Sequence, residues 1–362
     1  MASESPSRLH RAWEALKPAK IDCLIVSAPP NIRYLTGFTG SNALVLVWNG
    51  GAALFTDPRY AIQAARETSG CTVRVARGAL QPVLMKLAKR KRFRRIGFEQ
   101  ARLTYSAYEN LREKLTLGAS LHPVAGLVDT LRMVKSPREI DLIRRSVLLN
   151  SQAYERAIRK VRPGITTESA LAARIEYEMR VLGAEKPAFD TIVASGSRTA
   201  LPHAQPTAGP VANNQLLLID MGASREGYAS DMTRMAFAGR PGPKVRAVYR
   251  AVLEAQLAAI GAVKPGVTAG SVDRAARRVL RAAGMERAFV HSTGHGLGLE
   301  IHEGPRLGRQ ENTPLAEGMA ITIEPGAYFE GFGGIRIEDT VVVTSSGCEV
   351  LTPTSKELLL LE

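Results

Sequence analysis

The sequence has few of the features that secreted, membrane-spanning or disulfide-rich proteins need. Its 362 residues include only 3 cysteines, at widely separated positions, which excludes a disulfide framework and a cysteine-based zinc site. No apolar run reaches the roughly 18 residues of a membrane span. The first residues are polar and lack the apolar core of a signal peptide. We therefore expect a cytoplasmic protein with no membrane contact.

Motifs of several other chemistries are also missing. There is no Gly-x-Ser-x-Gly elbow, and no cysteine lies beside the histidines of the C-terminal region, so covalent acyl catalysis has little support. The glycine-rich segment 294–298 lacks the Lys-Ser/Thr pair of a phosphate loop. No zinc finger or ribonucleoprotein-type aromatic motif accompanies the net charge of +14. The basic run from Lys86 to Arg95 fits the solvated end of a helix, where cations are favourable, and we expect no nucleic-acid partner.

The distribution of expected elements predicts two domains. Residues 1–130 alternate between strands and helices, which favours a small α/β domain. Its expected elements are strands at 23–26, 43–48, 52–56, 72–75 and 94–99, and helices at 7–17, 59–68, 80–91 and 105–114. Residues 131–362 favour an α+β domain, which begins with Ser136 as a helix N-cap and Pro137 in the first turn. Strands dominate after residue 185, with helices at 243–262 and 269–283.

Two aspartates flank a predicted hairpin in the second domain. Asp220 ends an apolar strand, and Asp231 follows the turn at Glu226-Gly227. A hairpin centred between Arg225 and Glu226 would place the two aspartates directly opposite each other, with Cβ atoms about 4.5–5.5 Å apart. Opposed carboxylates destabilise a hairpin unless a cation lies between them. The alternative is that one aspartate is only a turn or edge residue.

Three histidines lie close together in a glycine-rich segment. His291, His295 and His302 are interleaved with Gly294, Gly296 and Gly298, which would let the backbone approach a ligand closely. A single histidine is more often a satisfied core residue, but three among glycines favour a functional segment. His203 ends another loop, 195–203, and taken alone is an exposed loop histidine.

Two glutamates follow apolar strands near the C-terminus. Glu324 shares a strand face with Thr322, and Arg336 and Glu338 share a face of the strand expected at 335–340. A cross-strand salt bridge between Arg336 and one glutamate is the simpler interpretation, and it is compatible with a metal site. Buried carboxylates are costly unless they are paired or bind a metal. One imidazole and four carboxylates suit a pair of divalent ions, which makes the chain a candidate metallohydrolase.

In this order, the residues resemble the pita-bread metallopeptidases (M24-type), specifically the Xaa-Pro exopeptidases prolidase and aminopeptidase P. The resemblance covers residues 135–355 and includes the spacings of the aspartates and histidines, the Glu324-Pro325-Gly326 turn and the Ile335–Asp339 strand. Segments 34–38 and 56–60 resemble the creatinase-type N-terminal domain of the same enzymes. The implied fold is a creatinase-type α/β domain followed by an α+β pita-bread catalytic domain.

The resemblance also implies roles for individual residues. Asp220 would bind one ion, His295 and Glu324 the other, and Asp231 and Glu338 would bridge the two. A hydroxide held between the ions would attack the carbonyl before proline, with Glu324 as general base. The catalytic histidines would be His203 and His302, which steady the substrate. The implied substrate-binding or outer positions are His291, Arg306, Tyr328 and Arg336. Manganese is the expected metal, with cobalt or zinc possible, and the expected assembly is a homodimer acting on small peptides.

The preferred substrate length stays open. Arg306 lies where prolidases carry an arginine for the free carboxylate of a dipeptide, whereas segment 36–41 resembles small aminopeptidase P proteins. Two alternatives to an Xaa-Pro peptidase also stay open. One is a hydrolase with the same site that acts on non-proline peptides or other esters or amides, and the other is a non-catalytic binding module of the same fold.

Overall fold

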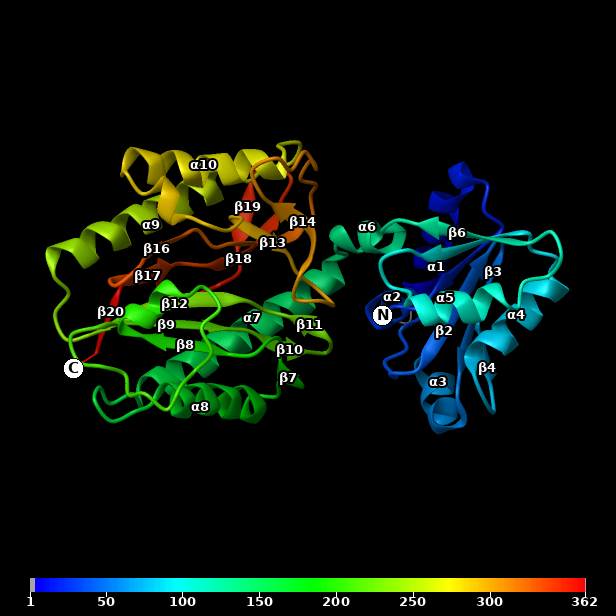
Figure 1. Ribbon diagram of the computed structural model, residues 1–362, viewed down its shortest axis with the longest axis horizontal. Helices are drawn as coiled ribbons and strands as arrows, with labels where there is room; N and C mark the ends of the chain where they lie inside the picture. Colours follow the sequence, from blue (N-terminus) through cyan, green and yellow to red (C-terminus); the bar gives the residue numbers. More distant parts are fainter. Residues whose placement is uncertain (1–3, 362) are drawn as a thin grey trace. The chain divides into compact units, whose positions relative to one another are not determined.

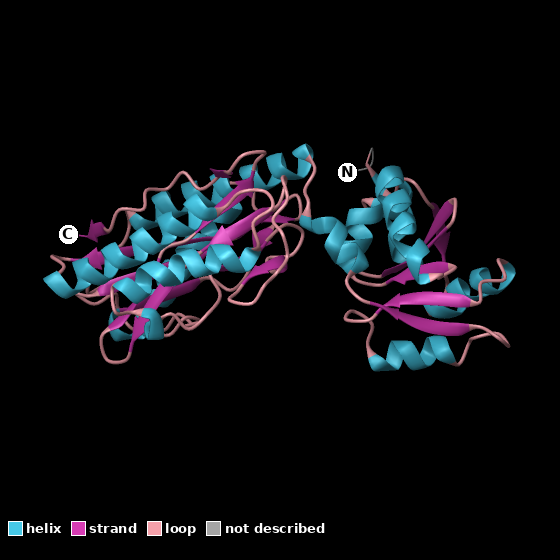
Figure 2. Cartoon of the chain, turned by 90° about the horizontal axis from the view of Figure 1, so that it is seen from above, coloured by secondary structure: helices cyan, strands magenta, loops and turns pink. Residues whose placement is uncertain are grey.

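The chain divides between Arg132 and Met133 into two units, which are described separately (Figures 1 and 2). The computed structural model describes residues 4–361. Within that range no helix is both long and apolar enough to cross a membrane.

The N-terminal unit is built on a six-stranded mixed sheet with strand order β4-β3-β2-β1-β5-β6. Its strands are β1 Cys23–Val26, β2 Ala43–Trp48, β3 Gly51–Thr56, β4 Thr72–Val75, β5 Arg95–Glu99 and β6 Ser120–Val124. The strands β1, β2 and β3 pair antiparallel, and the outer pairs are parallel. All four residues of β1 are buried because helices cover both faces of the sheet, which explains the uninterrupted apolar run in the sequence.

The helices of this unit include two that the sequence did not predict. They are α1 Ser5–Leu16, α2 Pro29–Thr36, α3 Ala61–Glu67, α4 Leu80–Arg90, α5 Tyr105–Arg112 and α6 Leu127–Met133. The missed helices are α2 and α6, and β6 was missed as well. Pro29-Pro30 begins α2 because proline is tolerated in a first helical turn. The carboxylate of Glu99 completes this helix start by accepting hydrogen bonds from the backbone N–H groups of Ser27 (2.6 Å) and Ala28 (2.9 Å).

The C-terminal unit contains two helix pairs, each followed by antiparallel strands. The helices are α7 Pro137–Ile158, α8 Glu168–Val181, α9 Pro243–Ala262 and α10 Ala269–Ala282. The predicted N-cap is confirmed: the Ser136 hydroxyl accepts from the Glu139 N–H, and the Glu139 carboxylate accepts from the Ser136 N–H. The short 3-10 helices of the whole chain are η1 Lys17–Ala19, η2 Pro58–Tyr60, η3 Gly196–Ala200 and η4 Glu286–Ala288.

The strands of this unit form two main sheets and two small ones. The first half of the unit contributes β7 Lys186–Pro187, β8 Ile192–Ser195, β9 Leu216–Met221, β10 Ala223–Arg225, β11 Tyr228–Ala229 and β12 Met232–Ala238. The second half contributes β13 Gly294–Gly296, β14 Glu303–Leu307, β15 Ala320–Ile323, β16 Gly326–Phe329, β17 Gly333–Arg336, β18 Asp339–Val343, β19 Cys348–Val350 and β20 Leu359–Leu361. The main sheets have the orders β20-β12-β9-β8 and β14-β13-β15-β18-β19.

The core of the C-terminal unit lies on both sides of β9. Leu217 and Ile219 pack with α7 and α8, whereas Leu216 and Leu218 belong to the cluster formed by α9, α10, β15 and β18. Figure 1 shows the two helix pairs on opposite sides of these strands. Because side chains alternate along a strand, Asp220 continues the face of Leu216 and Leu218 and points toward the second half of the unit. Strand alternation thus directs Asp220 into the interior of the unit.

Candidate metal centre

One cavity of about 750 Å³ collects most of the predicted site residues. All five expected ligands line it: Asp220, Asp231, His295, Glu324 and Glu338. The other predicted residues that line it are His203, His291, His302, Arg306 and Arg336. Tyr328 is the exception, because it lies behind the wall formed by His291 and Arg336 and hydrogen-bonds to both. A volume of this size suits a small ligand such as a short peptide.

The two aspartates come from neighbouring strands, but they are not directly opposed. Asp220 pairs with Thr233, so the predicted register was wrong by two residues. The turn is centred on Glu226 and Gly227, whose φ angles of 49° and 80° are the positive values that a two-residue hairpin turn requires. Asp231 precedes β12 and, by alternation, shares the face of Thr233. The aspartates therefore meet diagonally across the hairpin.

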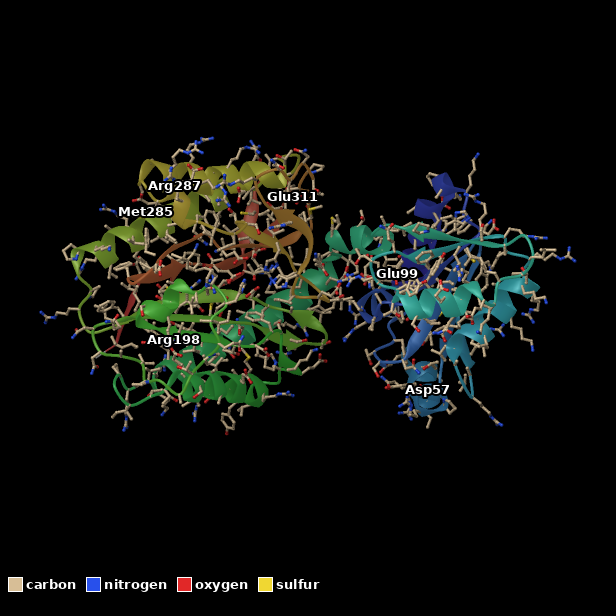
Figure 3. All side chains as sticks on the ribbon, viewed as in Figure 1. Asp57, Glu99, Arg198, Met285, Arg287 and Glu311 are labelled. Carbon is tan, nitrogen blue, oxygen red and sulfur yellow. The ribbon has the colours of Figure 1, made fainter. Side chains whose placement is uncertain are left out.

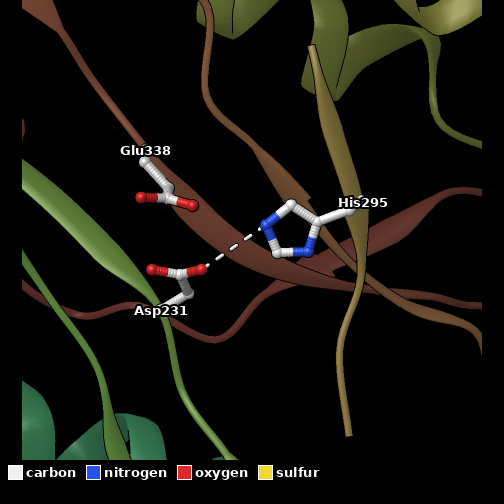
Figure 4. Close-up of side chains that lie close together, drawn as sticks. All are labelled: Asp231, His295 and Glu338. Carbon is white, nitrogen blue, oxygen red and sulfur yellow. Dashed lines mark ion pairs between the residues drawn. The ribbon is translucent and has the colours of Figure 1, made fainter. Parts of the chain in front are cut away.

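His295 sits in the middle of β13 and points a ring nitrogen at two carboxylates. Its Nδ1 donates to the carbonyl of Gly296 (3.0 Å), which leaves the lone pair on Nε2. That Nε2 lies 3.5 Å from Asp231 Oδ2 and 3.4 Å from Glu324 Oε1; Figure 4 marks the contact with Asp231. An unprotonated nitrogen facing two carboxylate oxygens is an arrangement that a cation would stabilise.

The glycines around His295 serve strand packing and not the approach of a ligand. A Cβ atom on Gly294 would lie 2.0 Å from the carbonyl oxygen of Thr322, and one on Gly296 would lie 2.0 Å from that of Gly304. Neighbouring backbones therefore occupy the space that side chains would need. This corrects the interpretation drawn from the sequence.

The two glutamates are held by threonine hydroxyls. Thr322 donates to Glu324 Oε1 (3.2 Å), and Thr233 donates to Glu338 Oε2 (2.8 Å). Glu338 lies between β17 and β18, so the single strand expected at 335–340 is interrupted. Strand alternation had placed Thr322 beside Glu324, but nothing in the sequence pointed to Thr233.

The carboxylates are short of hydrogen-bond donors. Burial, reinforced by the neighbouring carboxylates, raises the pKa of Asp231 and of Glu338 well above the ordinary values, and burial raises the pKa of Glu324 to about 8. Burial also lowers the pKa of His295 to about 4. Asp220 Oδ1 is buried without a partner among the described residues. A bound cation would therefore stabilise the ionised carboxylates of this cluster.

The donor set fits a divalent cation. Asp231, His295 and Glu338 each offer one atom, and these three atoms lie within 4.8 Å of one another. Oxygen donors outnumber the single imidazole nitrogen, which suits hard divalent ions. The residues present therefore match a metal centre.

Arg336 links this cluster to a second network. Its guanidinium donates to Asp220 Oδ2 (2.6 Å), to the Thr233 hydroxyl (3.0 Å) and to the Tyr328 hydroxyl (2.7 Å). The expected salt bridge of Arg336 thus forms with an aspartate and not with a glutamate. The Tyr328 hydroxyl contacts His291 Nε2 (2.9 Å). The other ring nitrogen of His291, Nδ1, donates to the Ser292 carbonyl. Burial raises the pKa of Tyr328 to about 12 and lowers that of His291 to about 4, so the hydroxyl donates to a neutral imidazole.

The remaining predicted residues lie around the cavity. The ring of His302 packs against that of His295 with centroids 4.4 Å apart. His203 and Arg306 are exposed on the cavity wall. Sequence reasoning missed Asp190 and Glu303, which also line the cavity, and Lys135, whose ammonium pairs with Glu303 at 2.7 Å. No pattern in the sequence singled these residues out.

The fold and the site together define a class of protein, an enzyme that binds divalent metal ions. Residues 141–345 match metallopeptidase family M24, and residues 8–134 match the creatinase/prolidase N-terminal domain. The chain belongs to metallopeptidase family M24, a family whose members use divalent metal ions. The expected fold class, a creatinase-type α/β domain followed by an α+β pita-bread domain, is confirmed.

Solved and curated relatives span nearly the whole chain. An Xaa-Pro dipeptidase from Bacillus anthracis has a TM-score of 0.95 and 38% identity, covering 98% of this chain and 99% of that one. An X-Pro aminopeptidase from Thermotoga maritima MSB8 has a TM-score of 0.89 and 37% identity, covering 96% and 100%. The Xaa-Pro dipeptidase of Pyrococcus furiosus is 38% identical over 352 residues, covering 97% of this chain and 99% of that protein.

Proposed function

We propose that this chain is an exopeptidase that hydrolyses the Xaa-Pro bond at the N-termini of peptides or in Xaa-Pro dipeptides. The main support is the cavity in which three buried carboxylates and one partly buried carboxylate face one imidazole. Full-length relatives named Xaa-Pro dipeptidase and X-Pro aminopeptidase supply the substrate class. The size of the cavity is consistent with a short peptide.

In this proposal the cavity holds two divalent manganese ions, because a single nitrogen among oxygen donors disfavours a structural zinc site. Asp220 would bind one ion, His295 and Glu324 the other, and Asp231 and Glu338 both. When bound, the ions would acidify a water molecule and polarise the carbonyl that precedes proline. His295 is already oriented for this role by the hydrogen bond from its Nδ1 to Gly296.

Proton transfer would fall to Glu324. Its carboxyl group lines the cavity, and its Oε1 lies 3.4 Å from His295 Nε2, so it faces the space in which the ions and their water would be held, within reach of the proton to be moved. It would take a proton from water and deliver it to the departing proline nitrogen. Thr322, which donates to Glu324 Oε1, would hold the carboxylate in place.

The histidines on the wall would position the substrate. His302 packs against the ligand His295, and His203 lines the same cavity. Both could donate hydrogen bonds to the peptide carbonyl as negative charge develops on its oxygen. His291, Tyr328 and Arg336 would act from behind by fixing Asp220.

A direct test combines metal analysis with a peptide assay. The protein is purified without chelator, its metal content is measured by mass spectrometry, and proline release from Ala-Pro is followed with added manganese. The proposal expects about two ions per chain, activity on Ala-Pro and none on Ala-Ala. Activity on both would favour a broader hydrolase, and metal binding without any hydrolysis would favour a binding module.

Arg306 would set the preference for dipeptides, since a planar guanidinium suits the free carboxylate of proline. Arg306→Ala should raise KM for Ala-Pro about tenfold or more, yet leave a longer Ala-Pro-Yaa peptide nearly unaffected. Arg306→Lys is the matched control, because lysine keeps the positive charge but lacks the planar guanidinium with its two parallel donors. Equal losses on both substrates would remove Arg306 from this role.

We further propose a cytoplasmic homodimer without a nucleic-acid partner, following the family resemblance and the low cysteine content. Light scattering on the purified protein tests the assembly. A shift assay with duplex DNA and with RNA at physiological salt tests the absence of a nucleic-acid partner, which matters because the net charge is +14.

A further inference from the structure

Most charged groups that line the cavity already have an ion-pair partner or belong to the cluster around His295. Asp220 is paired with Arg336, and Glu303 is paired with the buried ammonium of Lys135. Asp231, Glu324 and Glu338 belong to the cluster around His295. Two charged side chains are left over, Asp190 and Arg306. They have opposite signs, and neither forms an ion pair within residues 4–361.

Asp190 is exposed and makes no hydrogen bond through its side chain to any described residue, although its backbone is tightly placed. Two residues earlier, the Ala188 N–H donates to the Gly222 carbonyl at 2.8 Å. Two residues later, Ile192 pairs with Asp220 in the sheet. The segment that carries Asp190 is therefore fastened on both sides to the strand end that carries Asp220. The backbone that carries this free carboxylate is thus held at a fixed place on the cavity wall.

We propose that Asp190 binds the N-terminal ammonium group of the substrate and, with Arg306 at the carboxylate, makes the cavity selective for zwitterionic dipeptides. This inference rests on the function proposed above and deepens it. A dipeptide near neutral pH carries an ammonium and a carboxylate at opposite ends, and the cavity offers one free charge for each. Charge-assisted hydrogen bonds at both ends fix the orientation of the peptide relative to the metal cluster.

The ammonium group forms and breaks no bond in the reaction, so its contact with Asp190 is made both in the ground state and in the transition state. Its loss should therefore appear in KM and not in kcat. Asp190→Asn keeps the size of the side chain and removes only its charge. Asp190→Glu keeps the charge and serves as the matched control.

The test compares two ligands that differ only in the ammonium group: Ala-Pro as substrate and propionyl-proline as competitive inhibitor. We expect Asp190→Asn to raise KM for Ala-Pro about tenfold, with kcat and the inhibition constant of propionyl-proline nearly unchanged. Asp190→Glu should recover part of the loss. An unchanged KM in Asp190→Asn, or an equal weakening of both ligands, would overturn the assignment of Asp190. A wild-type protein without activity on Ala-Pro would instead overturn the proposed function itself, and this inference with it.

Discussion

Both units bury carboxylates, but they treat them in opposite ways. In the N-terminal unit, Glu99 accepts from the N–H groups of Ser27 and Ala28 and from the Asn31 amide (2.6 Å). Asp57 is likewise surrounded by donors, and the Arg59 guanidinium together with Asn42 holds its pKa below the ordinary range. Figure 3 labels Glu99 and Asp57.

In the cluster around His295 in the C-terminal unit, the carboxylates face each other and have few donors. The side-chain nitrogen that faces Asp231 Oδ2 is the imidazole Nε2 of His295 at 3.5 Å, and the pKa of Asp231 is raised and not lowered. Burial is similar in the two units, with Glu99 6% and Asp231 5% exposed. The difference therefore lies in the partners: satisfied carboxylates stabilise a fold, and unsatisfied ones indicate a site that binds a cation.

The largest expected effect comes from removing the proposed base. Glu324→Gln should lower kcat on Ala-Pro by about 10²–10⁴-fold, because the amide does not accept the proton. Glu99→Gln should leave kcat per folded molecule unchanged. Initial rates normalised to the folded fraction from circular dichroism measure both, and a Glu324→Gln variant that keeps its kcat would contradict the assignment.

Replacing Glu99 in the N-terminal unit should instead lower stability and leave kcat unchanged. Glu99→Gln should lower the free energy of unfolding by about 2–3 kcal/mol, because donors at the start of α2 lose a charged acceptor. Urea denaturation with manganese present would measure it. Glu14→Gln, at an exposed pair with Lys17, is the control and should cause no measurable change. A loss of metal in Glu99→Gln without loss of stability would break the contrast between the units.

Replacing a carboxylate of the metal cluster should change the free energy of unfolding in opposite directions with and without metal. In chelated protein, Glu338→Gln should raise the free energy of unfolding by about 1 kcal/mol, because it removes one of several crowded carboxylates. In manganese-loaded protein the same variant should be less stable than the wild type, because it binds the ions less tightly. Thermal unfolding with and without chelator measures both. Destabilisation in both states would make Glu338 an ordinary structural residue.

The last prediction concerns His291, in the wall of the cavity. Burial lowers its pKa from 6.5 to about 4, so the unfolded chain takes up a proton before the folded one as the pH falls. Its contribution to stability is complete above about pH 6.5 and is lost as the pH falls toward 4. His291→Gln should flatten this dependence by up to about 1 kcal/mol per pH unit. Denaturation curves between pH 4 and pH 7 would measure the slope, and identical slopes would contradict the prediction.

Residue types and strand alternation made much of the site predictable. Apolar strands that end in Asp220 and Glu324 identified carboxylates that fold into the interior, and the structure brings all five expected ligands to one cavity. The hairpin register was beyond the sequence, because it depends on Glu226 adopting a positive φ that glycine or asparagine more often takes.

Other features depended on tertiary contacts. The helix α2 starts at Pro29 because Glu99, 70 residues later in the chain, completes its first turn. The strand β6 lacks the apolar pattern of a buried strand, and only its pairing with β5 defines it. Tyr328 was expected near the site, at a substrate-binding or outer position, and its place behind His291 follows from the pairing of β16 with β17, which sequence alone does not supply.

The close packing of backbone around Gly294 and Gly296 has a consequence for how this enzyme can change. His295 is positioned largely by main-chain contacts between β13, β14 and β15, which the replacement of a side chain cannot adjust gradually. Asp190 and His203 lie in connections between strands, and their exposed side chains can be replaced without displacing those strands. Substitutions in the cavity wall can therefore change the range of substrates while the metal-binding framework stays the same.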